Sequence, residues 1–249
     1  MALNVYGKAG GVAWGLAEPL HSDVVVGVDV AGSYAVATVL TDSGDPRVEW
    51  IYEFNPEVEV AAVLEPLIYS ALRAASRDRG GPLSSVVVHR DGRAHWLEVE
   101  AFRRAVARAK AEGMLEEDAF YALVEVRKRV TARMFKEREG RLLNPDKGVY
   151  VWLDKETLLV ATTGAPERPH PAFSGLVRPV ALSLVNSSHW EKSLLDLARD
   201  VYWLAQLHWG SAFVTPRLPI TTLYAHKIAH LLSLGAYPPP EYRGKLWFL

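Results

Sequence analysis

The sequence predicts an α/β fold in which helices cover the faces of a mixed central sheet. Three apolar, strand-forming segments near the N-terminus are separated by short turn-forming stretches, and they predict an antiparallel meander at 24–30, 34–41 and 47–54. Apolar residues then recur at helical spacing over 59–76, with Pro66 inside the pattern, where we expect the helix to begin or kink. A meander followed by helix and further strands is typical of a sheet with helices packed on it.

The remaining segments continue the same alternation. We expect strands at 85–89, 120–130, 150–153, 158–162 and 177–184, and helices at 97–112, 190–207 and 221–234. We expect a proline-containing loop at 164–175. No internal repeat or low-complexity linker divides the chain, so we expect one domain.

Composition limits the classes of protein that this chain can represent. Its 249 residues are 49% hydrophobic, which is enough for a substantial core. The net charge of −1 gives no overall attraction to polyanions, so any nucleic-acid binding must come from local basic clusters. The absence of cysteine excludes disulfides and thiol nucleophiles. No apolar run is long enough for a membrane helix and no signal-peptide pattern is visible, which predicts a soluble cytoplasmic protein.

Two aspartates stand in or directly after apolar strands. Asp29 lies within Val24–Ser33, and Asp91 follows the valine run of Val86–Arg93, 62 positions further on. A charge in a buried strand is costly unless a partner compensates it. A shared divalent cation would do so, as in metal-dependent phosphoryl-transfer enzymes. The alternative for each residue is an ordinary turn or N-cap aspartate.

Three further residues are candidate ligands for the same cation. His226 lies near the start of the last predicted helix, where it is either a nitrogen ligand or a packing or surface histidine. Glu57 and Glu59 open the first helix, where acidic residues are also favoured simply by the helix dipole.

Basic residues gather after the strand segment Ala122–Val126. Arg127, Lys128 and Arg129, with Arg133 and Lys136 beyond them, either form a solvated face or line a groove that contacts phosphates. Lys8, in a glycine-rich stretch at 7–11, could present its ammonium group to a phosphate.

Five motifs in order make the chain resemble the PIWI domain of a prokaryotic (archaeal-type) Argonaute protein over nearly its whole length. The first two, Gly7–Gly11 and Val26–Val30, resemble the lysine–glycine motif at the start of that domain and its first catalytic strand. His89–Gly92 resembles its second catalytic strand, and Val126–Phe135 resembles its basic strand. Leu218–Ile220, with Tyr224–His226, resembles the segment that carries its last ligand. The terminal Leu246–Leu249 resembles the apolar end of prokaryotic members.

The resemblance implies an RNase H-like fold and cleavage of a strand paired to a short 5′-phosphorylated guide. It also implies a catalytic tetrad that binds two Mg²⁺ or Mn²⁺ ions. Asp29, Asp91 and His226 fall on three of the four positions, and Glu59 is the best match for the fourth, with Glu57 as the alternative.

The resemblance also implies contacts to the nucleic acid. Lys8 and the carboxylate of Leu249 match positions that hold the guide 5′ phosphate, the carboxylate acting through a divalent cation. Arg217, Tyr224 and Lys227 are further expected contacts.

The domain organisation that follows is one PIWI domain over 1–249, with residues 1–22 at the boundary between the MID and PIWI domains. We find no MID, PAZ or N domain in the sequence. Because the MID domain supplies half of the guide-phosphate pocket in the family, we expect a separate MID-containing chain as partner.

Two other functions remain open. The chain could hold a guide–target duplex with little cleavage of its own. A more distant alternative is an actin-like or sugar-kinase ATPase, since Asp29–Ser33 resembles a phosphate-turn motif, although a second glycine-rich loop is not found. Whether guide and target are RNA or DNA, and whether the role is host defence, also stay open.

Overall fold

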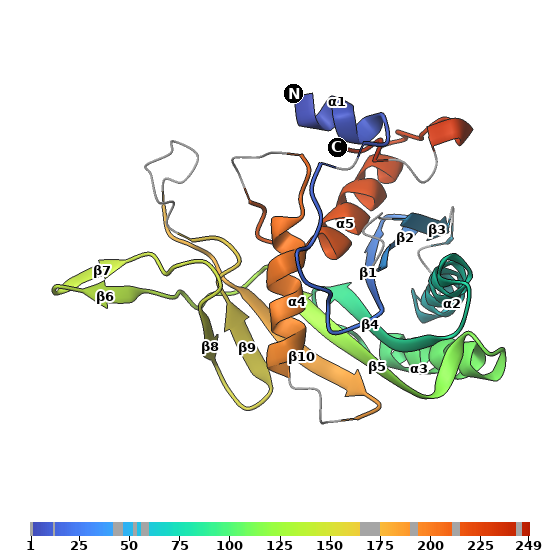
Figure 1. Ribbon diagram of the computed structural model, residues 1–249, viewed down its shortest axis with the longest axis horizontal. Coiled ribbons are helices and arrows are strands. Elements are labelled where there is room, and N and C mark those ends of the chain that lie inside the picture. Colours follow the sequence, from blue (N-terminus) through green and yellow to red (C-terminus); the bar gives the residue numbers. More distant parts are fainter. Residues whose placement is uncertain are drawn as a thin grey trace.

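A computed structural model of the chain describes residues 2–11, 13–41, 47–51, 54–55, 60–164, 175–189, 194–210, 215–242 and 246–249. Eight strands form one mixed sheet in the order β3-β2-β1-β4-β5-β10-β9-β8 (Figure 1). Their bounds are β1 Val24–Ala31, β2 Tyr34–Thr41, β3 Arg47–Ile51, β4 Leu83–Asp91, β5 Leu115–Arg127, β8 Tyr150–Trp152, β9 Thr157–Val160 and β10 Val180–Ser187. A separate hairpin, β6 Lys136–Arg138 and β7 Arg141–Leu143, projects from the body of the molecule. The helices are α1 Ala2–Lys8, α2 Val60–Arg79, α3 Trp96–Ala111, α4 Leu194–Gln206 and α5 Ile220–Ser233, with a short 3₁₀ helix at Pro240–Tyr242.

The centre of the sheet combines the predicted meander with two parallel crossovers. β1, β2 and β3 pair in antiparallel fashion, and the two-residue turn between β1 and β2 places Gly32 at φ +56°, a conformation that favours glycine. β1 pairs with β4, and β4 with β5, in parallel. The carboxyl ends of these three strands therefore meet at one edge of the sheet.

Helices α2 and α3 cover one face of this sheet. Alternate residues of β1 such as Val24, Val26 and Val28 pack there, in one buried cluster with the apolar stripes of both helices. Helix α2 starts at Val60 and continues through Pro66, so the predicted kink position lies inside it. The described residues before α2 end at 55 and resume at 60, which leaves Glu57 and Glu59 outside the part of the chain that the structure describes.

Helices α4 and α5 cover the opposite face (Figure 1). Val25 packs with α5, whereas Val87 and alternate residues of β5 and β10 pack with α4. Gly27 allows α5 to approach β1 closely, because a Cβ at this position would lie 2.2 Å from the backbone carbon of Thr221. Both faces of β1 are thus buried, which explains its almost uninterrupted apolar sequence.

Several predictions of local structure were wrong or incomplete. The N-terminal segment contains helix α1, which we did not predict, and its Gly7 packs against Leu249 at the other end of the chain. β5 begins at Leu115 and not at Phe120, and it ends at Arg127. The start of β5 is polar and exposed at 116–118, where its pairing with β4 is irregular, and it lacks the apolar pattern on which strand prediction depends. The β6–β7 hairpin was also missed, because its short strands are largely exposed and charged.

None of the helices in the described ranges has the length and apolar character needed to cross a membrane.

Candidate metal centre

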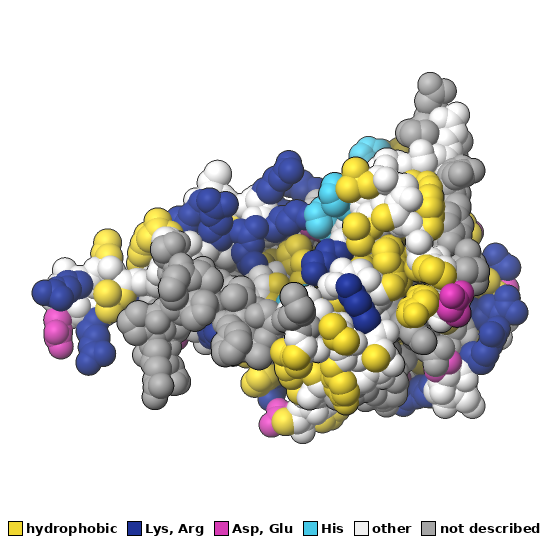
Figure 2. Space-filling view, turned by 90° about the horizontal axis from the view of Figure 1, so that it is seen from above, with side chains coloured by type: hydrophobic (Ala, Val, Ile, Leu, Met, Phe, Trp, Pro, Cys, Tyr) yellow, Lys and Arg dark blue, Asp and Glu magenta, His cyan; other side chains and the backbone are white. Residues whose placement is uncertain are grey.

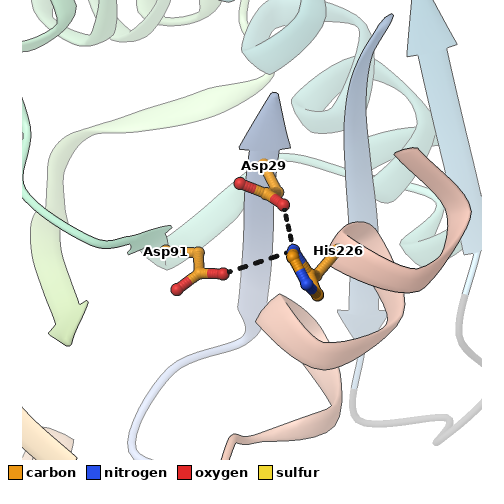
Figure 3. A group of neighbouring side chains, drawn as sticks. All are labelled: Asp29, Asp91 and His226. Carbon is orange, nitrogen blue, oxygen red and sulfur yellow. Dashed lines mark hydrogen bonds and ion pairs between the residues drawn. The ribbon is translucent and has the colours of Figure 1, made fainter. Parts of the chain in front are cut away.

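Asp29, Asp91 and His226 come together at the carboxyl edge of the sheet, from β1, β4 and α5 (Figure 3). One potential ligand atom from each residue lies within 4.8 Å of the others. His226 Nδ1 is 2.8 Å from Asp29 Oδ2 and 3.7 Å from Asp91 Oδ2. The two aspartates are 7% and 9% exposed, whereas the histidine is open to solvent.

The strand register explains why the two aspartates meet. Val28 of β1 stands beside Arg90 of β4 in the parallel pair, so the residue that follows each of them lies at the same level of the sheet edge. Gly92 then takes φ +95°, which lets the chain turn away directly after Asp91. A backbone hydrogen bond of 3.0 Å from Gly92 to Val126 holds this turn against β5.

The carboxylates of Asp29 and Asp91 lie close together and are largely buried, which makes it unfavourable for both to be charged. Burial raises the pKa of Asp29, and the neighbouring charge of Asp91 raises it further. The hydrogen bond to His226 acts in the opposite direction but does not cancel the rise in pKa. A divalent cation would relieve both the desolvation and the repulsion, so the donor set fits a metal ion.

A second layer of charges surrounds the pair of aspartates. Arg90 extends towards both, with its guanidinium 3.7 Å from Asp29 Oδ1 and 2.6 Å from the backbone oxygen of Asp91. Glu98 accepts hydrogen bonds of 3.0 and 3.2 Å from the same guanidinium and also caps the start of α3 through His95. Helix α3 is thereby tied to the candidate centre.

The centre opens into a cleft of about 720 Å³. Its walls combine the three candidate ligands with basic side chains and with residues of the β8–β9 region. On the face that Figure 2 shows, many lysine and arginine side chains gather beside histidine side chains. A neighbouring cleft of about 730 Å³ shares part of its lining with the first. The shared residues are Arg93, Arg127 and Thr157.

Arg127, Lys128 and Arg129 of the predicted basic cluster line the first cleft, and the members of the cluster differ in their contacts. Lys128 Nζ is 2.6 Å from Asp91 Oδ2. Arg127 donates to Ser183 at 2.8 Å, while Arg129 is exposed. Arg133 donates from one nitrogen to the backbone oxygens of residues 130, 131 and 132. Burial lowers the pKa of Arg217, and the charges of Arg178 and Arg133 lower it further, which marks a concentration of positive charge.

The other predicted contacts lie away from the three ligands or are buried. Tyr224 is 1% exposed and packs against Phe248, so the structure does not bring it to the surface where a nucleic acid could touch it. Burial lowers the pKa of Lys227, and the nearby charge of Lys8 lowers it further. Leu249 lies beside α1, as the contact with Gly7 shows. A metal-binding role for its carboxylate stays a prediction.

Sequence reasoning missed Arg90, Arg93 and Glu98. Arg90 carried a usable signal, because it is a charged residue directly before a candidate ligand in an apolar strand. Glu98 also carried one, since it is an acidic residue in the first turn of the helix predicted at 97–112. Arg93 belongs to a turn, and its position in both clefts follows only from the folded chain.

The sheet order and the acidic centre together define an α/β domain of the RNase H-like class. The sequence model of the Piwi domain matches residues 1–235, and the chain therefore belongs to the Piwi domain family. Among known relatives, Piwi-like protein 1 of Danio rerio is 23% identical over 256 residues, and Piwi-like protein 1 of Gallus gallus is 24% identical over 267 residues. Each alignment covers 97% of this chain but only 29% of the relative.

Solved structures show the same fold. Drosophila Piwi superposes with a TM-score of 0.77 at 22% identity, over 100% of this chain and 35% of that one. The Argonaute of Clostridium butyricum, bound to a guide DNA and a 19-mer target DNA, gives a TM-score of 0.73 at 23% identity, over 100% of this chain and 32% of that one. The RNase H-like fold expected from the sequence is confirmed, and both prokaryotic and eukaryotic proteins share it.

Proposed function

We propose that this chain is the catalytic domain of a guide-directed endonuclease that depends on divalent metal ions. The observation that carries the proposal is the convergence of Asp29, Asp91 and His226 at the sheet edge of a Piwi domain. The terminal segment Leu246–Leu249 favours the prokaryotic branch of the family, by the resemblance noted above.

The proposed cofactors are two Mg²⁺ or Mn²⁺ ions. Asp29 and Asp91 would bind them through carboxylate oxygens, and His226 through an unprotonated ring nitrogen. When bound, such ions activate a water for attack on the scissile phosphorus and stabilise the leaving oxygen. The protein supplies fixed donors: Asp29 is oriented by His226, and Asp91 by the turn at Gly92. Glu59 is the proposed fourth ligand and Glu57 the alternative.

The cleft beside the centre has the features expected of a nucleic-acid path. Arg93, Arg127 and Arg129 line it, and cationic side chains provide most of the affinity for a phosphate backbone. The adjoining cleft adds Lys155 and the partly exposed ring of Trp152, a type of surface on which bases stack. We propose that the paired guide and target strands, DNA or RNA, run through these two clefts.

A separate MID-containing chain is the proposed partner for guide binding. Lys8 and Lys227 bring two positive charges close together, which favours an anionic ligand such as the guide 5′ phosphate. The Leu249 carboxylate would act there through a divalent cation. We expect this chain alone to bind a 5′-phosphorylated guide weakly and to bind it more tightly when the MID-containing chain is added. Equally tight binding of 5′-phosphorylated and 5′-hydroxyl guides by this chain alone would contradict this part of the proposal.

Cleavage of a guide-paired strand in Mn²⁺ tests the endonuclease proposal. Asp91→Ala should abolish cleavage, whereas Asp146→Ala should leave it unchanged. Asp146 is a suitable control because it also pairs with a lysine at 2.6 Å, on the exposed side of the β6–β7 region. Cleavage that survives in Asp91→Ala would show that the activity comes from elsewhere.

The second candidate function is a binding module that holds a guide–target duplex. It requires only the two adjoining clefts with their basic lining, Arg93, Arg127, Arg129 and Lys155, and no metal ion. Tight, salt-sensitive duplex binding without Mn²⁺-dependent cleavage would identify this function.

A further inference from the structure

Among the described lysines and arginines, Lys128 makes the shortest contact with a carboxylate oxygen of the candidate metal centre. Its Nζ lies 2.6 Å from Asp91 Oδ2, the same oxygen that faces His226 at 3.7 Å. This geometry is a charge-assisted hydrogen bond to a candidate ligand atom. Within the described residues, Lys128 therefore places its positive charge where a metal ion would bind.

The position of Lys128 follows from the parallel pairing of the strands. Asp91 stands beside Val126 in the β4–β5 register, and Lys128 is the first residue after the end of β5. Lys128 thus lies two residues beyond Val126, and its long side chain reaches back to the Asp91 carboxylate. The lysine side chain is 25% exposed and that of Asp91 is 5% exposed, so water screens this pair only in part.

The neighbouring arginines are engaged differently. Arg90 is neutralised by Glu98, and Arg127 donates to Ser183. Arg133 donates to backbone oxygens of its own loop. Each of these cations has a partner other than Asp91 at hydrogen-bond distance. For Lys128, the partner at hydrogen-bond distance is a carboxylate oxygen of Asp91, which the proposed function assigns to the metal.

We propose that Lys128 is the internal counter-ion of the metal centre and competes with the divalent cation for Asp91. Lys128 stabilises Asp91 in the metal-free protein and has to give up Oδ2, or tolerate a nearby positive charge, when the cation binds. Either way, Lys128 weakens metal binding and so sets the metal concentration at which the centre fills. After leaving Asp91, its ammonium group remains in the cleft, where it can contact a phosphate. This inference rests on the proposed metal centre.

Calorimetric titration of the whole chain with Mn²⁺, without nucleic acid, tests the inference. Lys128→Gln should bind Mn²⁺ about tenfold more tightly than the wild type, as expected when a partly screened positive charge near the cation is removed. Lys128→Arg keeps the charge and should stay close to the wild type. Lys136→Gln is the matched control, because Lys136 forms an exposed pair with Asp146 at the same 2.6 Å distance.

Thermal unfolding provides a second readout that does not depend on activity. In EDTA, Lys128→Gln should unfold at a lower temperature than the wild type, because Asp91 loses its partner. Saturating Mn²⁺ should raise its unfolding temperature by more than it raises that of the wild type. A purely structural lysine would produce the first effect without the second.

The outcomes separate this inference from the function on which it rests. If the wild type binds Mn²⁺ and Asp29→Asn does not, the metal centre stands. If Lys128→Gln then binds Mn²⁺ with unchanged or lower affinity, the competition by Lys128 is refuted while the centre remains. If no variant binds Mn²⁺, both the centre and the competition are refuted.

Discussion

His226 Nδ1 lies 2.8 Å from Asp29 Oδ2, although 197 positions separate the two residues in the chain. This contact joins the last long helix to the first strand of the sheet at the point where the acids converge (Figure 3). The site therefore exists only when α5 is docked on β1. Its integrity can be tested through the packing of the fold as well as through the ligands themselves.

The charge of Asp29 should destabilise the metal-free protein at neutral pH. Burial raises the pKa of Asp29 above its ordinary value of 3.8, and the charge of Asp91 adds to this effect. A carboxyl group with a raised folded-state pKa contributes stability below the unfolded pKa and loses that contribution as the pH rises through the folded-state value. In EDTA, Asp29→Asn should therefore become more stable relative to the wild type between about pH 4 and pH 7.

Thermal unfolding of both proteins across this pH range is the measurement. Asp146→Asn is the control for removing an aspartate that lies on the surface, with its side chain 65% exposed. A large loss of stability in Asp29→Asn at pH 7 would show instead that the charge is required for folding.

The close approach of α5 to β1 should depend on Gly27. A Cβ at this position would lie 2.2 Å from the Thr221 backbone carbon, and the helix would have to move. We expect Gly27→Ala to cost about 1–3 kcal/mol in the free energy of unfolding, as overpacked cores do. Because α5 carries His226, Mn²⁺ affinity should fall as well. Gly81→Ala, whose added Cβ would have no neighbour within 4 Å, should change neither quantity.

Glu98 should stabilise the protein through two contacts at once. It neutralises Arg90 and accepts a 2.8 Å hydrogen bond from the backbone of His95 at the start of α3. We expect Glu98→Ala to lower the free energy of unfolding by about 1–3 kcal/mol, measured with urea. Glu100→Ala, on the same helix, removes only an exposed 3.8 Å pair with Arg103 and should cost less than about 0.5 kcal/mol. Equal effects of the two substitutions would contradict this role of Glu98.

Arg129 should contribute to nucleic-acid affinity without base preference. It is exposed and lines the cleft beside the acids. If it contacts one phosphate, Arg129→Gln should weaken duplex binding at low salt and reduce the slope of log K against log salt by about 0.7–0.9. Arg77→Gln, at an exposed position in the last turn of α2 that lines neither cleft, should leave the slope unchanged. The same slope in both variants would place Arg129 outside the path.

The sequence predicted those parts of the fold in which local pattern and tertiary environment agree. β1, β2 and β4 are buried apolar runs, and α3 has both a regular stripe and a capping box. Helix α1 escaped prediction because it is only seven residues long, includes Gly7, and lies against the far end of the chain. Its position depends on a contact that no local window contains.

The candidate site was predictable to the same extent. Asp29 and Asp91 carried a signal because each is a charge in or after a strand that both helix layers bury. The contact between Lys128 and Asp91 gave no signal in the sequence, because it depends on β5 lying beside β4 in a particular register. Tyr224 shows the converse case: the resemblance puts it among the expected nucleic-acid contacts, whereas only the folded chain shows that packing against Phe248 leaves it 1% exposed.

The most direct test of the account is a crystal structure of the chain soaked in Mn²⁺, with anomalous scattering used to locate the metal. We expect an anomalous peak within coordination distance of the Asp29 and Asp91 carboxylates and the His226 ring. Lys128 should then have moved away from Asp91. If the three side chains keep their positions and Mn²⁺ binds elsewhere or not at all, the assignment of this site as a metal centre is contradicted.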